Sequence, residues 1–262
     1  MGADKSNRKG FVLFEPACLR ASVAQDRPGT KMTTLAEIRE SSTISQIIEG
    51  QPQHAMIALL MGAGAFTLMA APDNPPALFG LTTTGWAGVG IVLALVHQIV
   101  VAAVFRLQLH INLMTRLFGD RDMSVWAAIF LPLLAARALS VILTGWADTV
   151  PLTESRSIEI ILGLTLLAPA IWGMHSTLVH FTLRRALGGD HFRDDIAAMP
   201  MVNKGVFKYT RNGMYGVVFL GLWGIALLFG SWNALVLALF QHAYIWVHMY
   251  CTESPDMRRI YG

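Results

Sequence analysis

Charged residues are scarce in this sequence. They make up 14% of its 262 residues, whereas hydrophobic residues make up 54%. A soluble domain carries about 25% charged residues, so this composition excludes an ordinary soluble globular protein. The mean hydropathy of +0.49 agrees, and we expect an integral membrane protein.

Cysteine is almost absent, since only Cys18 and Cys251 occur. Two distant cysteines exclude a disulfide framework and a cysteine metal cluster. No two histidines have zinc-site spacing with a carboxylate, so we predict no metal. The first apolar run begins after about fifty polar residues, so we expect no secretory signal.

The apolar residues gather in long runs. These runs cover residues 54–71, 85–107, 124–146, 158–181 and 214–250. The first four approach the ~20 residues that cross a bilayer core, and residues 230–233 divide the fifth into two antiparallel helices. We therefore predict an all-α, multi-pass transmembrane helical bundle of about six spans, the last two forming a hairpin.

The basic residues alternate with these runs. Eighteen of the 20 Lys and Arg residues lie in segments 1–53, 106–123, 182–213 and the C-terminal tail, while Arg156 lies on the other side and Arg137 inside a span. The basic residues behind the net charge of +3 are therefore explained by the orientation of the spans in the membrane, and we predict no nucleic-acid partner. The positive-inside rule predicts that both termini and the loop 182–213 are cytosolic.

The segment before the first span is polar. We interpret residues 1–31 as a flexible cytosolic tail, in which Met32 is a possible second start site. Residues 34–49 are predicted to form a short amphipathic helix, because Leu35, Ile38, Ile47 and Ile48 can share a face. Thr34 and Glu37 fit a capping box. This helix either lies on the membrane surface or is only a helical linker.

A polar, basic segment at 205–216 stands between two apolar runs. It resembles a signature of membrane methyltransferases, Gly-x-Phe/Tyr-x-x-x-Arg-His/Asn-Pro-x-Tyr. The residues in register are Gly205, Phe207, Arg211, Asn212 and Tyr215, with Gly213 in place of the proline.

Two further pieces strengthen the resemblance. The tail is similar to Glu-Glu-x-x-Leu-x-x-x-Phe-Gly; Glu253, Met257, Tyr261 and Gly262 keep the spacing, and Ser254 replaces the second glutamate. Residues 187–192 resemble the Leu-Gly-Asp-Tyr-Phe piece of phosphatidylethanolamine N-methyltransferases. The resemblance covers about residues 168–262. The sequence is closer to these enzymes than to the isoprenylcysteine carboxyl methyltransferases. We therefore expect a transmembrane methyltransferase domain at residues 51–262, preceded by a cytosolic tail of residues 1–50 that contains the short interfacial helix.

The resemblance implies S-adenosylmethionine as methyl donor, held between loop and tail. Arg211 is expected to pair with the donor carboxylate through two hydrogen bonds, and Glu253 to receive its amine or ribose hydroxyls. The implied donor-binding residues are Gly205, Tyr209, Arg211, Asn212, Tyr215, Gly216, Glu253 and Ser254. The alternative is that Arg211 and Lys208 only fix the orientation of the spans in the membrane, in which case Arg211 does not bind the donor.

The implied acceptor is a lipid amine in the bilayer, phosphatidylethanolamine or its methylated forms. Its head group must lose a proton before attack, and Glu253 and His191 are the candidate catalytic bases. Asp190, Arg258 and Arg259 are candidate substrate-binding residues, the two arginines for a lipid phosphate.

Two other functions stay open. One is carboxyl methylation of an isoprenylated cysteine, whose enzymes share the arginine and glutamate motifs. The other is a small membrane transporter, in which Arg137 and histidines such as His97 line a path. The absence of an internal repeat disfavours the transporter. The sequence gives no oligomeric partner.

Overall fold

The computed structural model describes residues 33–72 and 76–262, and the predicted tail at 1–31 and Met32 lie outside them. The described residues form helices and loops without a β-strand. The predicted all-α fold is therefore confirmed.

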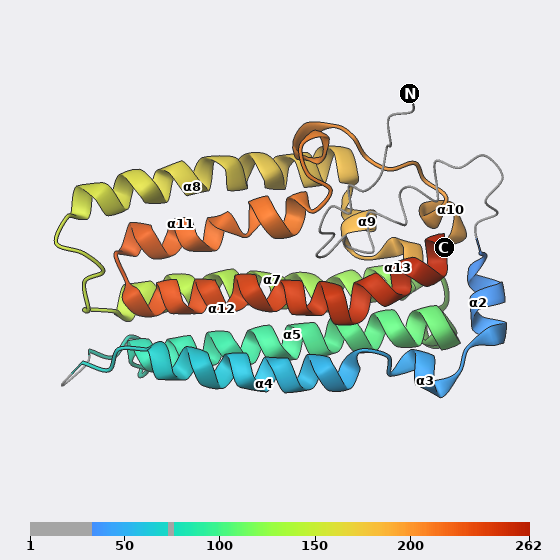
Figure 1. Cartoon of the computed structure of the whole chain (residues 1–262), viewed down its shortest axis with the longest axis horizontal. Coiled ribbons are helices and arrows are strands. Elements are labelled where there is room, and N and C mark those ends of the chain that lie inside the picture. Colours follow the sequence, from blue (N-terminus) through green and yellow to red (C-terminus); the bar gives the residue numbers. More distant parts are fainter. Residues whose placement is uncertain (1–32, 73–75) are drawn as a thin grey trace, which may run out of the picture.

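All the predicted helical segments are present (Figure 1). They are α4 Gln51–Leu68, α5 Thr83–Ile111, α7 Asp122–Ala147, α8 Arg156–Ser176, α11 Leu220–Phe229 and α12 Trp232–His248. Among the described residues, four stretches are long and apolar enough to cross a membrane: Thr83–Ile111, Leu113–Ala147, Arg156–Phe181 and Trp232–Tyr261. The stretch Gly213–Phe229 is apolar but shorter, and α4 opens with the polar residues Gln51 and Gln53.

The hairpin between α11 and α12 follows from its turn residues. Gly230 ends α11 with a φ of +63°, a conformation that glycine adopts without a steric penalty. Ser231 then caps α12 by accepting a hydrogen bond from the Ala234 amide at 3.0 Å. Asn233, predicted in the turn, instead lies inside α12 and binds the backbone of Ala70.

The helices run lengthwise, so their connections gather at two ends of the bundle (Figure 1). Residues 34–50, 112–121, 177–218 and 249–262 lie at one end, which we call the basic end. The predicted basic loop and C-terminal tail thus share one end of the molecule.

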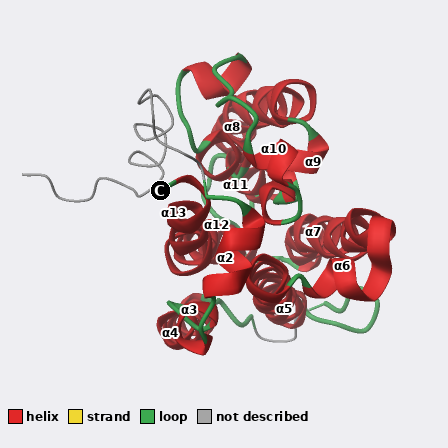
Figure 2. Ribbon diagram, turned by 90° about the vertical axis from the view of Figure 1, so that its right-hand side faces the viewer, coloured by secondary structure: helices red, strands yellow, loops and turns green. Residues whose placement is uncertain are grey.

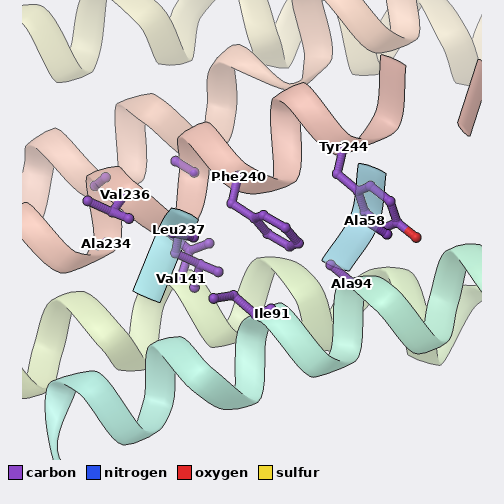
Figure 3. Packing of buried hydrophobic residues seen from close by; sticks show 12 residues of the cluster. Ala58, Ile91, Ala94, Val141, Ala234, Val236, Leu237, Phe240 and Tyr244 are labelled. Atoms are coloured by element: carbon purple, nitrogen blue, oxygen red, sulfur yellow. The ribbon is translucent and has the colours of Figure 1, made fainter. Parts of the chain in front are cut away.

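The main hydrophobic core lies between α4, α5, α7 and α12. Figure 3 shows Leu237, Phe240 and Tyr244 of α12 packed against Ile91 and its neighbours. Elsewhere α8 and α11 approach closely at Gly163 and Gly224, where a Cβ atom would lie about 3 Å from the facing carbonyl oxygen. Small residues allow such backbone approach in membrane bundles.

Two short helices occupy the predicted amphipathic segment, α2 Leu35–Ser41 and α3 Ile44–Ile47. The capping box of Thr34 and Glu37 is present. Leu35 and Ile38 are buried against protein, so the apolar face of α2 is not available to a bilayer. Ile44 on α3 is 78% exposed, and an interfacial position of α3 stays a prediction.

Three segments of the described chain are π-helical, and all lie at the basic end. They are η2 Thr177–Phe181, η5 Gly213–Val218 and η6 Met249–Glu253, the last leading into α13 Ser254–Tyr261. Such π-helical turns are rare and frequently mark functional sites. These turns therefore make the basic end the candidate location of a functional site.

Candidate active site

A pocket lies at the basic end where the loop 182–213, η5 and the C-terminal tail meet. We call it the loop–tail pocket. Its apolar and aromatic lining includes Phe105, Phe181, Met214, Met257 and Tyr261. The predicted site residues that line it are Asp190, His191, Arg211, Asn212, Tyr215 and Glu253.

Glu253 joins the tail to η5. It ends η6, and its carboxylate accepts a hydrogen bond from the hydroxyl of Tyr215 on η5. Nε2 of His248 lies 3.6 Å from the same carboxylate, and the Glu253 side chain is 21% exposed. Glu253 therefore combines fixed neighbours with access from the pocket.

His191 lies between two carboxylates. Its Nδ1 is 2.9 Å from Asp190, and its Nε2 is 3.3 Å from Asp256. The ring also stacks on Phe105 at a centroid distance of 4.3 Å. Burial alone would lower the pKa of His191, but the two carboxylates outweigh it and raise the pKa to about 10.

The pKa of Asp190 shifts in the opposite direction to that of His191. Burial acts to raise its pKa, but the charge and hydrogen bond of His191 and a hydrogen bond from the Tyr261 hydroxyl at 3.1 Å lower it overall. Asp190 is thus ionised and His191 protonated at neutral pH. An imidazolium whose two nitrogens both donate has no lone pair with which to accept a proton.

Asp256 and Arg106 complete this arrangement, and the sequence reasoning missed both as site residues. Asp256 is fully buried, and its second carboxylate oxygen lies 2.8 Å from Arg106 Nη1. Arg106 also donates to the backbone carbonyls of Glu49 and Cys251. We call Asp190, His191, Asp256 and Arg106 the ion network.

Sequence offers one signal for Arg106. It falls at the end of the predicted span 85–107, and a charged residue inside a span is a functional hint. Its position in the basic segment 106–123 instead favours a role in membrane topology. For Asp256 there is no such signal, because both its partners lie far away in the chain.

Several predicted site residues do not line the loop–tail pocket. Gly205 has a φ of +58° and packs so closely on α8 that a Cβ atom would lie 2.6 Å from Ser176 Oγ. Tyr209 is 75% exposed and faces Trp172. Gly216 of η5 and Ser254 of α13 also lie outside the lining.

The two tail arginines are engaged elsewhere. Arg258 binds the Glu49 carboxylate at 3.2 Å, and Arg259 binds the same carboxylate. These ion pairs hold α13 on the segment that leads into α4. Neither arginine lines the pocket.

Arg137 lies inside the bundle, as expected. It donates from Nε to Gln241 at 3.0 Å and lies 3.3 Å from Nδ1 of His97. These contacts join α5, α7 and α12 through hydrogen bonds, a common role of polar residues between membrane helices.

Known proteins are similar to the C-terminal part of this chain. Residues 158–262 match the family described as phospholipid methyltransferase. The chain is 34% identical over 74 residues to a phosphatidylethanolamine N-methyltransferase of Scheffersomyces stipitis, covering 28% of this chain and 9% of that protein. It is 30% identical over 121 residues to the enzyme of that name from Malassezia globosa, covering 45% and 12%.

The chain spans about a tenth of the length of these relatives. No solved structure gives a significant match. The loop, η5, η6 and α13 all lie within the matched segment, whereas α4, α5 and α7 precede it. The predicted resemblance is therefore confirmed: residues 158–262 are similar to the phospholipid methyltransferases.

Proposed function

We propose that this membrane protein transfers a methyl group from S-adenosylmethionine to the amine of a lipid head group, phosphatidylethanolamine or its methylated forms. The observation that carries the proposal is the loop–tail pocket. There the family-matched loop and tail bring two guanidinium groups, two carboxylates and several aromatic rings together at one end of a membrane bundle.

The pocket offers groups that suit this donor. Arg211 suits the donor carboxylate, because a guanidinium binds a carboxylate through two parallel hydrogen bonds. Glu253 suits the amine or the ribose hydroxyls, and the rings of Phe105 and Tyr215 suit a cationic sulfonium. Bound there, the donor would supply an electrophilic methyl group. Asn212 completes the donor contacts that we propose, while Gly205 shapes the loop.

Glu253 is the proton acceptor in this proposal. A lipid ammonium has no lone pair, so its nitrogen must lose a proton before it attacks. Glu253 is accessible from the pocket and is oriented by Tyr215. His191 is protonated between Asp190 and Asp256, so we assign it to holding the loop on the tail and not to proton abstraction.

The remaining parts of the assignment follow the charge distribution. The loop 182–213 and the tail carry most of the basic residues beyond the N-terminal segment, which favours a cytosolic basic end and a cytosolic active site. Arg258 and Arg259 would have to release Glu49 before binding a lipid phosphate. Residues 51–262 act as one transmembrane unit in this proposal.

The test is methyl transfer by the purified full chain, with methyl-labelled S-adenosylmethionine and vesicles that contain phosphatidylethanolamine. We expect label on the lipid amine. A protein that binds the donor but labels no lipid amine would remove the acceptor assignment. Label in the methyl ester of an added prenylcysteine would assign carboxyl methylation instead, and a protein that does not bind the donor would favour the transporter.

A further inference from the structure

A second cavity is lined mainly by residues of α4 and α5. These two helices lie side by side along one flank of the bundle (Figure 1). The volume of the cavity is about 520 Å³, within the ~300–1,000 Å³ of typical small-molecule sites. We call it the flank groove. Its walls are apolar residues of α3, α4 and α5, and Tyr244 of α12 contributes to its lining.

The flank groove borders the lipid-facing surface. Leu59 of α4 and Ile99 of α5 line it and are 71% and 61% exposed. Figure 2, which looks onto the basic end, places α4 at the edge of the bundle beside α5. Since α5 is one of the candidate membrane spans, this groove opens toward the acyl chains of the surrounding lipids.

The groove also has polar residues toward the basic end. Gln51, His54 and Arg106 line it there. His54 is 96% buried, since only 4% of its surface is exposed, and its Nε2 has no hydrogen-bond partner within the described residues. A buried polar atom without a partner is costly, so His54 Nε2 offers an unused hydrogen-bonding position to a polar ligand group.

One histidine ring separates the flank groove from the proposed active site. The ring of His248 lies 5.7 Å from that of His54, and its Nε2 lies 3.6 Å from the Glu253 carboxylate. Gln51 likewise donates to Thr252 Oγ1 at 3.2 Å, one residue before Glu253. The polar part of the groove thus adjoins the carboxylate that we propose as proton acceptor.

We propose that the flank groove holds an acyl chain of the acceptor phospholipid, with the head group directed past His54 toward Glu253. This inference rests on the proposed function and adds the site of the lipid acceptor. The apolar walls suit an acyl chain, and the unpartnered His54 nitrogen suits a polar head group. The residues of α4 and α5 lie outside the family-matched segment, so the family match gives them no role in lipid binding.

Filling the groove tests the proposal. Ala55 and Ala103 line it and are exposed, so Ala55→Trp and Ala103→Trp place a large ring in it. We expect each to raise the KM for phosphatidylethanolamine by about tenfold or more, by analogy with the selectivity that apolar pockets reach. The affinity for S-adenosylmethionine should stay at the wild-type value.

Met56→Trp is the matched control, because Met56 is the next residue of α4, is 58% exposed and does not line the groove. It should leave the KM unchanged. A wild-type KM in both groove variants, or an equal rise in the control, would overturn the proposal while leaving lipid methylation standing.

A readout without turnover separates this inference from the proposed function. Phosphatidylethanolamine with a photoreactive acyl chain is irradiated with the wild-type protein, and the labelled peptides are mapped. We expect label in residues 51–59 and 95–107 and its loss in Ala55→Trp. Label confined to other helices would overturn the groove. Label in the groove of a protein that methylates no lipid would keep the lipid site and remove the enzymatic assignment.

Discussion

Two carboxylates of the C-terminal tail lie one helical turn apart in opposite environments. Glu253 faces the loop–tail pocket, is partly exposed and accepts a hydrogen bond from Tyr215. Asp256 is fully buried and pairs with Arg106 and His191. A carboxylate at the edge of a pocket can contact a ligand, whereas a carboxylate enclosed by two cationic side chains stabilises the fold. From this difference we propose that Glu253 takes part in the chemistry, whereas Asp256 joins the loop, the tail and α5 through His191 and Arg106.

The largest effect is expected from Glu253→Ala. Removing a general base lowers turnover by about 10²–10⁴-fold, and the loss of the carboxylate should also weaken binding of S-adenosylmethionine. The thermal midpoint should stay near that of the wild type, because the side chain is at the pocket surface. Methyl transfer, donor titration and thermal unfolding measure the three quantities. Wild-type donor affinity in this variant would remove Glu253 from the donor site.

Asp256→Asn should act on stability instead. It leaves Arg106 and His191 buried without their shared countercharge, and removing one partner of a buried ion pair costs about 3–5 kcal/mol. We expect a clear fall in the thermal midpoint. Asp195→Asn on α10 Asp194–Ala197 is the control, since Asp195 is exposed, and it should unfold like the wild type. Equal midpoints for both variants would contradict a structural role of Asp256.

The ion network also predicts a pH dependence. The pKa of His191 is raised to about 10 in the folded protein, above the ~6.5 of an unfolded chain. Its stabilisation is therefore complete below about pH 6.5 and is lost as the pH rises toward 10, at a slope of at most about 1.4 kcal/mol per pH unit for one proton. Thermal midpoints between pH 6.5 and 10 should fall less steeply in His191→Gln. Parallel curves would mean that His191 is not the titrating group.

The smallest effect is expected from Arg211→Lys, which keeps the charge but loses the two-pronged geometry. Losing one charge-assisted hydrogen bond costs about 1.5–3 kcal/mol, or roughly ten- to a hundredfold in donor affinity. Arg184→Lys is the control, because Arg184 belongs to the same loop but does not line the pocket. If Arg211→Lys binds the donor like the wild type, Arg211 serves topology alone.

Much of the fold was predictable because its signals are local. Apolar runs of near-membrane length predicted the helices, and the segment 230–233 predicted the final hairpin. In the structure Gly230 and Ser231 form its turn, whereas Asn233 belongs to α12. The positions of the basic residues predicted that the loop 182–213 and the tail share one end. Motif spacing then selected Arg211, Tyr215 and Glu253, which line one pocket in the structure.

The remaining features depend on long-range pairs that a single sequence does not encode visibly. Asp256 pairs with Arg106, 150 positions earlier in the chain, and nothing near either residue indicates the other. For Arg258 and Arg259 the sequence predicts a lipid phosphate as partner, because arginine commonly binds phosphate. In the structure both arginines pair with the Glu49 carboxylate. The protonated state of His191 likewise follows only from the two carboxylates that tertiary structure places beside it.

Photochemical labelling with S-adenosylmethionine tests most directly whether the loop–tail pocket holds the methyl donor. The purified full chain is irradiated with donor labelled in its methyl group, and the labelled peptides are mapped, with excess unlabelled donor as competitor. We predict competable label on peptides that contain residues 211–215 and 249–257. Label confined to residues 51–147, or label that the competitor does not reduce, would contradict a donor site between the loop and the tail.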